Sequence, residues 1–205
     1  MKHSIKNDTS KTINPFSYWV LEGELSAGEY PGNQFSFRPS VTIATIVHQI
    51  NAFRKNGFRS LNTSSRKIGN LLDAGVHTFV DLTEDGERPA YMEHLHKERR
   101  RRSKRTDYFR FPITDRNVPD KSTMTDILDL IDSEIDEGKT VYVHCFRGLG
   151  RTGIVIGCYL VRKGMTGEEA ISHIKNLRTG LAGGFRTSPE NKLQENFILE
   201  WKDQD

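Results

Sequence analysis

This 205-residue sequence has only two cysteines, Cys145 and Cys158, too few for the disulfide framework of small secreted domains. A reducing compartment, the cytoplasm, is therefore expected. Neither cysteine has a second Cys or His at ligand spacing, so the sequence predicts no metal site. No apolar run approaches the roughly 20 residues of a membrane-spanning helix, so no membrane span is expected.

The chain also lacks internal repeats, low-complexity linkers and an N-terminal apolar stretch of the kind found in secretory signals. We expect residues 1–14 to form a disordered lead-in. Residues 15–205 should form a single domain, because a chain of this length builds one core more readily than two.

Short apolar segments alternate with amphipathic ones along the chain. This order predicts an α/β domain with a central, mainly parallel sheet flanked by helices. Strands are expected at 18–21, 25–28, 76–82, 108–113 and 140–144. Helices are expected at 66–74, 91–102, 123–137, 152–163, from Thr166 onward, and at 190–201. Residues 41–54 have helical spacing of apolar residues, but their β-branched run VTIATIV fits a strand as well.

Positive charge is concentrated in one segment, residues 96–105, which holds seven Lys or Arg and one Glu. A charge run on a helix is usually a solvated face. The alternative is contact with an anionic partner, such as lipid head groups or a polyphosphorylated ligand. No aromatic residues interleave the run, which argues against nucleic acid as the partner.

The most informative stretch is TVYVHCFRGLGRTGIVIG, residues 140–157. A strand delivers Cys145, and a buried helix begins after Arg151. A short turn between a strand and a helix can direct several backbone N–H groups into one concavity at the positive end of the helix dipole, where a tetrahedral oxyanion binds. Arg151 adds a two-pronged donor for phosphate oxygens, and the same field favours the thiolate of Cys145. The Thr152 hydroxyl is placed to hydrogen-bond the sulfur and help it leave.

Residues 144–153 match throughout the signature His-Cys, five residues, Arg, then Ser or Thr. The sequence therefore resembles the protein tyrosine phosphatase superfamily, in its dual-specificity-like branch. The resemblance implies that fold, with Cys145 as the nucleophile and Arg151 as the phosphate ligand, and it requires no cofactor. It also implies phosphate binding by the rest of the loop, which is Phe146, Arg147, Gly148, Leu149 and Gly150. In the superfamily the His before the nucleophile, here His144, supports the thiolate through hydrogen bonds.

The superfamily supplies the leaving-group proton from an Asp on an upstream loop. The sequence Pro-Ile-Thr-Asp at residues 112–115 matches the dual-specificity-like pattern, so Asp115 is expected to act as acid and then as base. Asp120 is the alternative, although it is better placed to begin the next helix. Gln194 could orient the hydrolytic water, or it could be a surface helix residue. Asp81 is interpreted as a strand-end cap.

The chain departs from the family pattern in two ways. It carries an extra segment at about residues 38–64, and it lacks the Trp-Pro-Asp triplet of the larger tyrosine-specific phosphatases. Three functions therefore stay open: a phosphotyrosine or dual-specificity protein phosphatase, an inositol phosphate or phosphoinositide phosphatase, and a non-catalytic module that binds phosphorylated ligands. Arg147, inside the signature loop, and the basic run would favour the second. Sulfur transfer or arsenate reduction fits less well, because Asp115 would have no task there.

Overall fold

A central mixed sheet organises the residues that the computed structural model describes, which are 12–32 and 63–202. Its six strands lie in the order β1-β2-β3-β6-β4-β5. They are β1 (Thr12–Asn14), β2 (Ser17–Leu21), β3 (Leu25–Glu29), β4 (Val76–Asp81), β5 (Asp107–Arg110) and β6 (Thr140–Cys145). Strands β3, β6, β4 and β5 run parallel, whereas β1 and β2 extend one side of the sheet as antiparallel strands. The predicted α/β fold with a central, mainly parallel sheet is confirmed.

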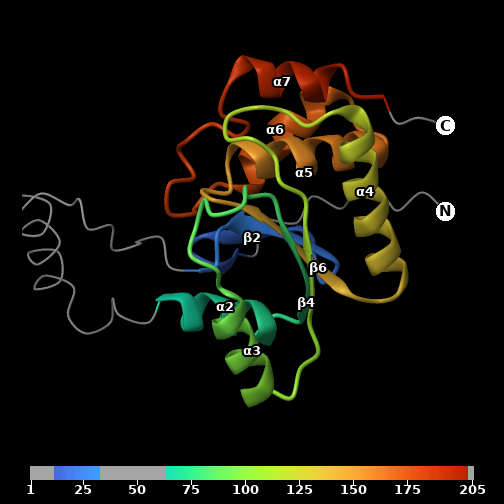
Figure 1. The fold of residues 1–205 in the computed structure, drawn as a ribbon. Helices are drawn as coiled ribbons and strands as arrows, with labels where there is room; N and C mark the ends of the chain where they lie inside the picture. The colour runs from blue at the N-terminus through green and yellow to red at the C-terminus, as the bar shows by residue number, and fades with distance from the viewer. Residues whose placement is uncertain (1–11, 33–62, 203–205) are drawn as a thin grey trace, which may run out of the picture.

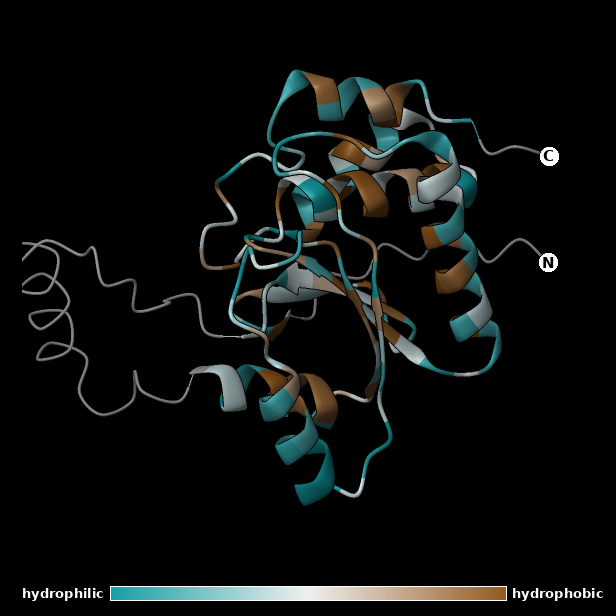
Figure 2. Cartoon of the chain, viewed as in Figure 1, coloured by the Kyte–Doolittle hydropathy of each residue, from teal (hydrophilic) through white to brown (hydrophobic). Residues whose placement is uncertain are grey.

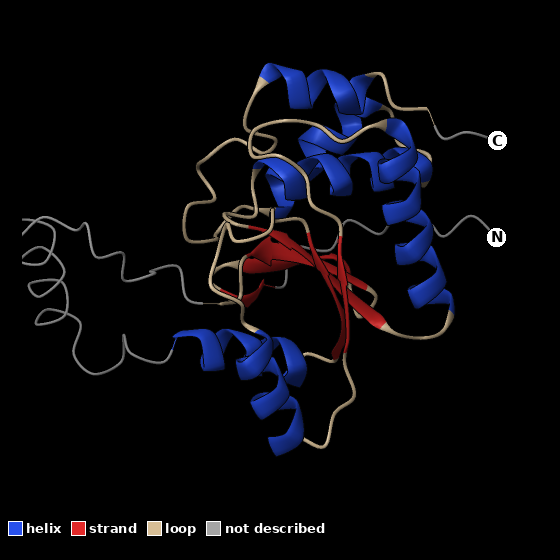
Figure 3. Ribbon diagram, viewed as in Figure 1, coloured by secondary structure: helices blue, strands red, loops and turns tan. Residues whose placement is uncertain are grey.

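Helices cover both faces of this sheet, as Figure 3 shows. They are α2 (Thr63–Asp73), α3 (Met92–Arg101), α4 (Lys121–Asp136), α5 (Gly150–Arg162), α6 (Gly167–Leu177) and α7 (Lys192–Leu199). Helices α2 and α3 lie on one face, and α4 to α7 lie on the other (Figure 1). None of the helices in the described part of the chain is long and apolar enough to span a membrane.

The two-residue period of a strand divides the buried side chains between two cores. In β6, Val141 and Val143 pack in the core on the α4–α5 side, whereas Tyr142 packs in the core beneath α2 and α3. The last residues of β6 continue this alternation. Cys145 belongs to the first core, and the ring of His144 stacks on Tyr142 in the second. The nucleophile candidate and its neighbouring histidine therefore lie on opposite faces of the sheet.

The helix ends follow the sequence signals. Asp120 caps α4 by accepting a hydrogen bond from the Thr123 N–H. Thr166 and Glu169 form a capping box at the start of α6, the helix expected from Thr166 onward. Gly164, just past α5, has φ +101°, a conformation that glycine adopts without steric cost.

Two expectations need correction. Thr12–Asn14 are not part of a disordered lead-in, because they form β1 and pair with β2. The strand predicted at 108–113 ends at Arg110. Beyond it the chain still follows β4, with hydrogen bonds from the Phe111 N–H to Asp81 O (3.0 Å) and from the Ile113 N–H to Leu82 O (3.2 Å). Pro112 lies between these two donors and has no N–H, so the regular ladder ends there. The segments 41–54 and 38–64 lie outside the described residues, apart from the two residues that begin α2.

Candidate active site

The predicted phosphate-binding loop, residues 145–151, connects the end of β6 to the start of α5. Parallel strands bring their carboxyl ends to one edge of the sheet, and Cys145 lies at that edge beside Glu29 of β3. Cys145 and Arg151 are 3% and 2% exposed, so the loop is embedded in the protein rather than projecting from it. Helix α5 begins without a side-chain cap, which leaves its N-terminal N–H groups available to a ligand.

The loop backbone is held by its carbonyl groups. Three carbonyls accept hydrogen bonds: Phe146 O from the Tyr30 N–H (3.1 Å), Gly148 O from Arg178 (2.8 Å), and Leu149 O from Ser188 Oγ (2.8 Å). Within the described part of the chain, the N–H groups of residues 146–151 donate to no other group. Three acceptors of the loop are therefore satisfied by the protein, while its donors are left for an oxyanion.

Gly148 is required by the shape of this loop. Its φ of +65° lies in the left-handed region, which a residue with a side chain seldom adopts. A Cβ here would also lie 2.3 Å from the carbonyl carbon of Gly28 in β3. The loop can therefore approach β3 this closely only with glycine at position 148.

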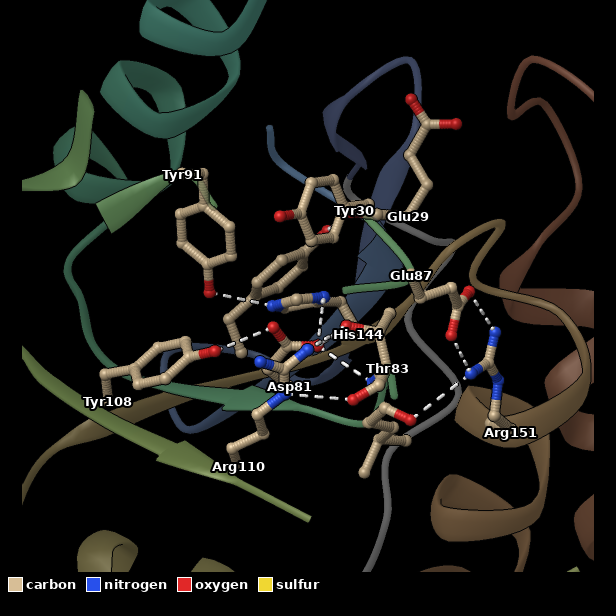
Figure 4. Close-up of polar contacts among 12 residues, drawn as sticks. Glu29, Tyr30, Asp81, Thr83, Glu87, Tyr91, Tyr108, Arg110, His144 and Arg151 are labelled. Atoms are coloured by element: carbon tan, nitrogen blue, oxygen red, sulfur yellow. Dashed lines mark hydrogen bonds and ion pairs between the residues drawn. The ribbon is translucent and has the colours of Figure 1, made fainter. Parts of the chain in front are cut away.

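Arg151 is fixed by carboxylates and a carbonyl. Its Nη1 and Nη2 donate to the two oxygens of Glu87 at 2.6 and 2.8 Å, as Figure 4 shows. Nη1 also donates to Ile113 O at 3.1 Å, and Nη2 lies 3.1 Å from Asp115 Oδ1. Burial by itself would lower the pKa of Arg151, but the hydrogen bonds to Glu87 and the nearby negative charges raise it above its ordinary value. The guanidinium therefore stays charged, and Glu87 and Ile113 O hold it in one orientation.

The two candidate acids are separated by the structure. Asp115 is an exposed residue within ion-pair distance of Arg151, at the carboxyl edge of the sheet. Asp120 is instead the N-cap of α4, where hydrogen bonds from Thr123 and Ser122 lower the pKa of its carboxyl. A carboxyl stabilised in its charged form is a poor proton donor. The geometry favours Asp115.

His144 is part of a buried polar network beneath the loop (Figure 4). Its Nε2 lies 2.8 Å from the Tyr91 hydroxyl, and its Nδ1 lies 3.9 Å from Asp81 Oδ1. Burial lowers the pKa of His144, which favours the neutral imidazole. Burial would raise the pKa of Asp81, but the proximity of His144 and hydrogen bonds from Thr83 and Tyr108 bring it below its ordinary value. Asp81 accepts from the Thr83 N–H just beyond β4, as a strand-end cap does.

Two predicted supporting residues differ from expectation in their contacts. Thr152 is fully buried, yet its hydroxyl has no hydrogen-bond partner among the described residues, so the expected bond to the sulfur is not formed here. Gln194 is also fully buried, which excludes the alternative of a surface residue. Its amide accepts from the Glu190 N–H (3.0 Å) and donates to Asn117 O (3.3 Å). A Cβ on Gly150 would lie 2.8 Å from Gln194 Nε2, so this side chain does border the loop.

Positive and aromatic side chains surround Phe146, the residue after the nucleophile. The Arg88 guanidinium lies 3.4 Å from the Phe146 ring centroid, and that of Arg147 lies 5.7 Å from it. The Arg147 side chain is 56% exposed and within 3.7 Å of Glu190. Arg147 is therefore available to a further negative charge on a substrate.

The basic run lies away from this site. Its helix, α3, ends next to the start of β5, at the sheet edge opposite the phosphate-binding loop (Figure 1), and Figure 2 shows this end as hydrophilic. Arg102 is committed to the fold, because it binds Asp73 of α2 at 2.7 Å and Glu98. The exposed members are Lys97, Arg100, Arg101, Lys104 and Arg105. They cannot line the same site as Cys145.

Sequence reasoning missed the residues that hold the site from distant segments. These are Glu84 and Glu87 after β4, Tyr91 at the start of α3, Arg178 after α6, and Ser188 before α7. Glu84 and Glu87 had a usable signal, because they follow a parallel strand at the edge where such sheets bind ligands. No group of three or more His, Cys, Asp or Glu residues suited to a metal was found among residues 12–32 and 63–202.

A thiol and a buried arginine on one oxyanion-binding loop define the class of cysteine-dependent phosphatases. The chain belongs to the family described as "Polymorphic toxin system, DSP-PTPase phosphatase", whose model it matches over residues 55–165, more than half of its length. The fold agrees with that of the crystal structure of Tk-PTP in the active form, with a TM-score of 0.59 over 95% of this chain and 98% of that chain, at 21% identity.

Curated relatives share parts of the sequence. The tyrosine-protein phosphatase CDC14 homolog of Schizosaccharomyces pombe is 39% identical over 34% of this chain and 13% of its own length. Protein tyrosine phosphatase domain-containing protein 1 of Bos taurus is 29% identical over 80% of this chain and 18% of its own length. The chain therefore spans less than a fifth of either relative.

Proposed function

We propose that the protein is a cysteine-dependent phosphatase that hydrolyses phosphotyrosine in proteins, with phosphoserine and phosphothreonine as further substrates of the same site. The observation that carries this proposal is the arrangement around Arg151. Its guanidinium, fixed by Glu87, lies on the loop that begins with Cys145 and 3.1 Å from the carboxylate of Asp115. This arrangement at one edge of the sheet supports the proposed roles of Arg151 as phosphate ligand, Cys145 as nucleophile and Asp115 as proton donor.

The chemistry follows from these positions. The Cys145 thiolate attacks phosphorus, the P–O bond to the leaving group breaks, and Asp115 donates a proton to the departing oxygen. The loop N–H groups and Arg151 stabilise the charge on the transferring phosphoryl group. A water then attacks phosphorus and gives its proton to Asp115, and the S–P bond breaks to regenerate the thiolate. The thiol must stay reduced, which supports the proposal of a cytoplasmic location.

The first test is phosphate release from a phosphotyrosine peptide, a phosphothreonine peptide, a phosphoinositide and a soluble inositol polyphosphate, with Cys145→Ser as the blank. Cys145→Ser should abolish turnover and keep binding of an unreactive phosphate mimic such as sulfate, because the loop donors remain. Asp115→Ala should lower turnover by about 10²- to 10⁴-fold and remove the alkaline limb of a rate profile that peaks at mildly acidic pH. Release by Cys145→Ser equal to the wild type would refute the nucleophile. No release from any substrate by the wild type would favour a phospho-ligand binding module.

An inositol phosphate or phosphoinositide is the second candidate substrate. The exposed Arg147 beside the nucleophile supports it, because this side chain could bind a second phosphate. The basic run does not add to this support, since it lies at the opposite edge of the sheet. Preference for the inositol polyphosphate in the panel, lost in Arg147→Ala, would favour this candidate over the first.

We also propose that the exposed cations at the end of α3 bind an anionic partner. Five exposed Lys or Arg side chains follow one another within nine residues there. Because this surface is remote from Cys145, such binding would place the protein near its substrates without occupying the catalytic site.

A further inference from the structure

The segment that carries Asp115 is a tight turn, Thr114–Asn117, which we name the acid loop. The Asn117 N–H closes it by donating to Thr114 O at 3.0 Å. Arg116 has φ +62°, in the left-handed region. This conformation is unfavourable for a residue that has a side chain, and such positions are normally occupied by glycine or asparagine. All four residues are exposed, so burial does not hold the turn in this shape. It needs support from neighbouring segments.

Glu84 supplies such support through both of its carboxylate oxygens. The Thr114 hydroxyl donates to Oε1 at 3.1 Å, and the backbone N–H of Asp115 donates to Oε2 at 3.3 Å. One carboxylate therefore binds the acid residue and the residue before it. Both donors depend on a negative or strongly polar acceptor at position 84.

The segment that presents Glu84 is itself anchored. Asp81 accepts hydrogen bonds from the Thr83 N–H and hydroxyl, at 2.9 and 2.7 Å. Arg110 donates to the carbonyl oxygens of Thr83 and Glu84, at 3.0 and 2.7 Å. Glu84 thus projects from a backbone fixed to the ends of β4 and β5, which makes it a firm support for the acid loop.

The same segment also holds the phosphate ligand. The Glu84 N–H donates to Glu87 Oε2 at 3.0 Å, and Glu87 binds both terminal nitrogens of Arg151 (Figure 4). Two carboxylates three residues apart therefore hold the proton donor and the phosphate-binding guanidinium. Their spacing along one rigid segment fixes the distance between Asp115 and Arg151.

We propose that Glu84 is a positioning residue for the general acid, an inference that rests on the proposed phosphatase function. It does not touch the reacting atoms. It holds the acid loop so that the carboxyl of Asp115 faces the site of P–O cleavage. On the other side of the turn, Asn191 and Gln194 contact Arg116 O and Asn117 O, the half that does not carry the acid.

Leaving-group dependence separates positioning of the acid from damage to the phosphate-binding loop. Glu84→Ala should lower kcat about tenfold for an alkyl phosphate, whose leaving group needs a proton, and much less for a nitrophenyl phosphate, whose leaving group does not. KM and the inhibition constant of vanadate should stay within about twofold, because Arg151 and the loop N–H groups are untouched. In an Asp115→Ala background the Glu84→Ala change should have no further effect. Glu84→Gln, which keeps an acceptor oxygen, should recover part of the rate.

Two further measurements make the outcome decisive. Asp85→Ala is the matched control, since Asp85 is one residue away and its side chain is 90% exposed. Within the described part of the chain it pairs only with Arg110 Nη1, whereas the bonds that anchor the Glu84 segment come from Arg110 Nε and Nη2. Amide hydrogen exchange of the acid loop should accelerate in Glu84→Ala and not in Asp85→Ala. This measurement needs no substrate and so does not depend on the proposed activity. Equal exchange in both variants and the wild type would overturn the proposal, as would a rate loss independent of the leaving group or additive with Asp115→Ala. A wild type that is inactive on every phosphate ester would instead refute the proposed function. The exchange measurement would still show whether Glu84 holds the acid loop.

Discussion

His144 and Cys145 are adjacent in sequence but serve opposite faces of the sheet. The alternation along β6 directs the His144 ring toward Tyr91 and Asp81, and Cys145 toward α5. The imidazole therefore cannot take a proton from the thiol directly. Its effect on the nucleophile has to pass through the backbone that the two residues share.

The burial of His144 predicts how stability depends on pH. Because burial lowers the pKa of His144 from its ordinary value of 6.5, the unfolded chain takes up a proton there before the folded protein does. Stability should thus be highest above that value and fall as the pH drops below it, by up to about 1.4 kcal/mol per pH unit. Asp81 adds to this loss only below about pH 4, where its unfolded form becomes protonated.

Urea unfolding of the wild type and His144→Asn between about pH 7 and pH 5 tests this expectation. The asparagine variant should be less stable at neutral pH, because it loses the ring contacts, but its stability should vary less with pH. Parallel curves for the two proteins would mean that His144 is not the group that titrates.

At the scale of elements, the loop of residues 145–151 is held by a residue that follows α6. Arg178 is 4% exposed and donates to Gly148 O at 2.8 Å. Its side chain connects the end of α6 to the middle of the loop. The position of the C-terminal end of α6 therefore contributes to the shape of the loop, through this one buried side chain.

Replacing Arg178 should affect both stability and anion binding. Arg178→Ala removes a buried, charge-assisted hydrogen bond, so the free energy of unfolding should fall by about 1.5–3 kcal/mol. Vanadate affinity should fall as well, because the Gly148 carbonyl is no longer held away from the anion. Arg186→Ala, in the exposed part of the same connection, is the control. If the two variants behave alike in urea unfolding and vanadate inhibition, Arg178 does not support the loop.

The elements also show what sequence can predict. Cys145, Gly148 and Arg151 lie on one short segment, so their spacing alone specifies the loop. Glu87 and Arg178 reach that loop from positions 64 residues upstream and 30 residues downstream of their partners, and no local pattern relates such distant positions. The predicted end of β5 lies three residues too far along the chain for a similar reason. Phe111 and Ile113 still pack against the core beyond Arg110, so their apolar character does not reveal where the regular strand pairing stops.

At the scale of the whole molecule, the proposed catalytic loop and the basic surface occupy opposite edges of the sheet (Figure 1). Removing exposed charges from α3 should therefore weaken anion binding without changing turnover. The variant Arg100→Ser, Lys104→Ser, Arg105→Ser should lose most of its binding to vesicles of anionic phospholipid, since each cation near such a surface contributes about 1 kcal/mol.

Co-sedimentation with these vesicles at low salt, alongside hydrolysis of a soluble phosphopeptide, measures both properties. The control variant, Lys121→Ser, Lys175→Ser, Lys202→Ser, removes three cations elsewhere on the protein. Its net charge therefore equals that of the α3 variant. Equal binding by both triple variants would show that total charge, rather than the α3 surface, governs association. Loss of turnover in the α3 variant would contradict the separation of the two edges.

The two cysteines lie at different depths, and neither forms a disulfide. Cys145 is at the mouth of a loop built to receive a ligand, whereas Cys158 is in the middle of α5 with no exposed surface. An alkylating reagent should thus report two different events in one sample. Modification of Cys145 would measure access to the catalytic loop, and modification of Cys158 would measure global opening of the fold. The rates of alkylation of the two thiols would therefore follow ligand access and unfolding independently, without any label added to the protein.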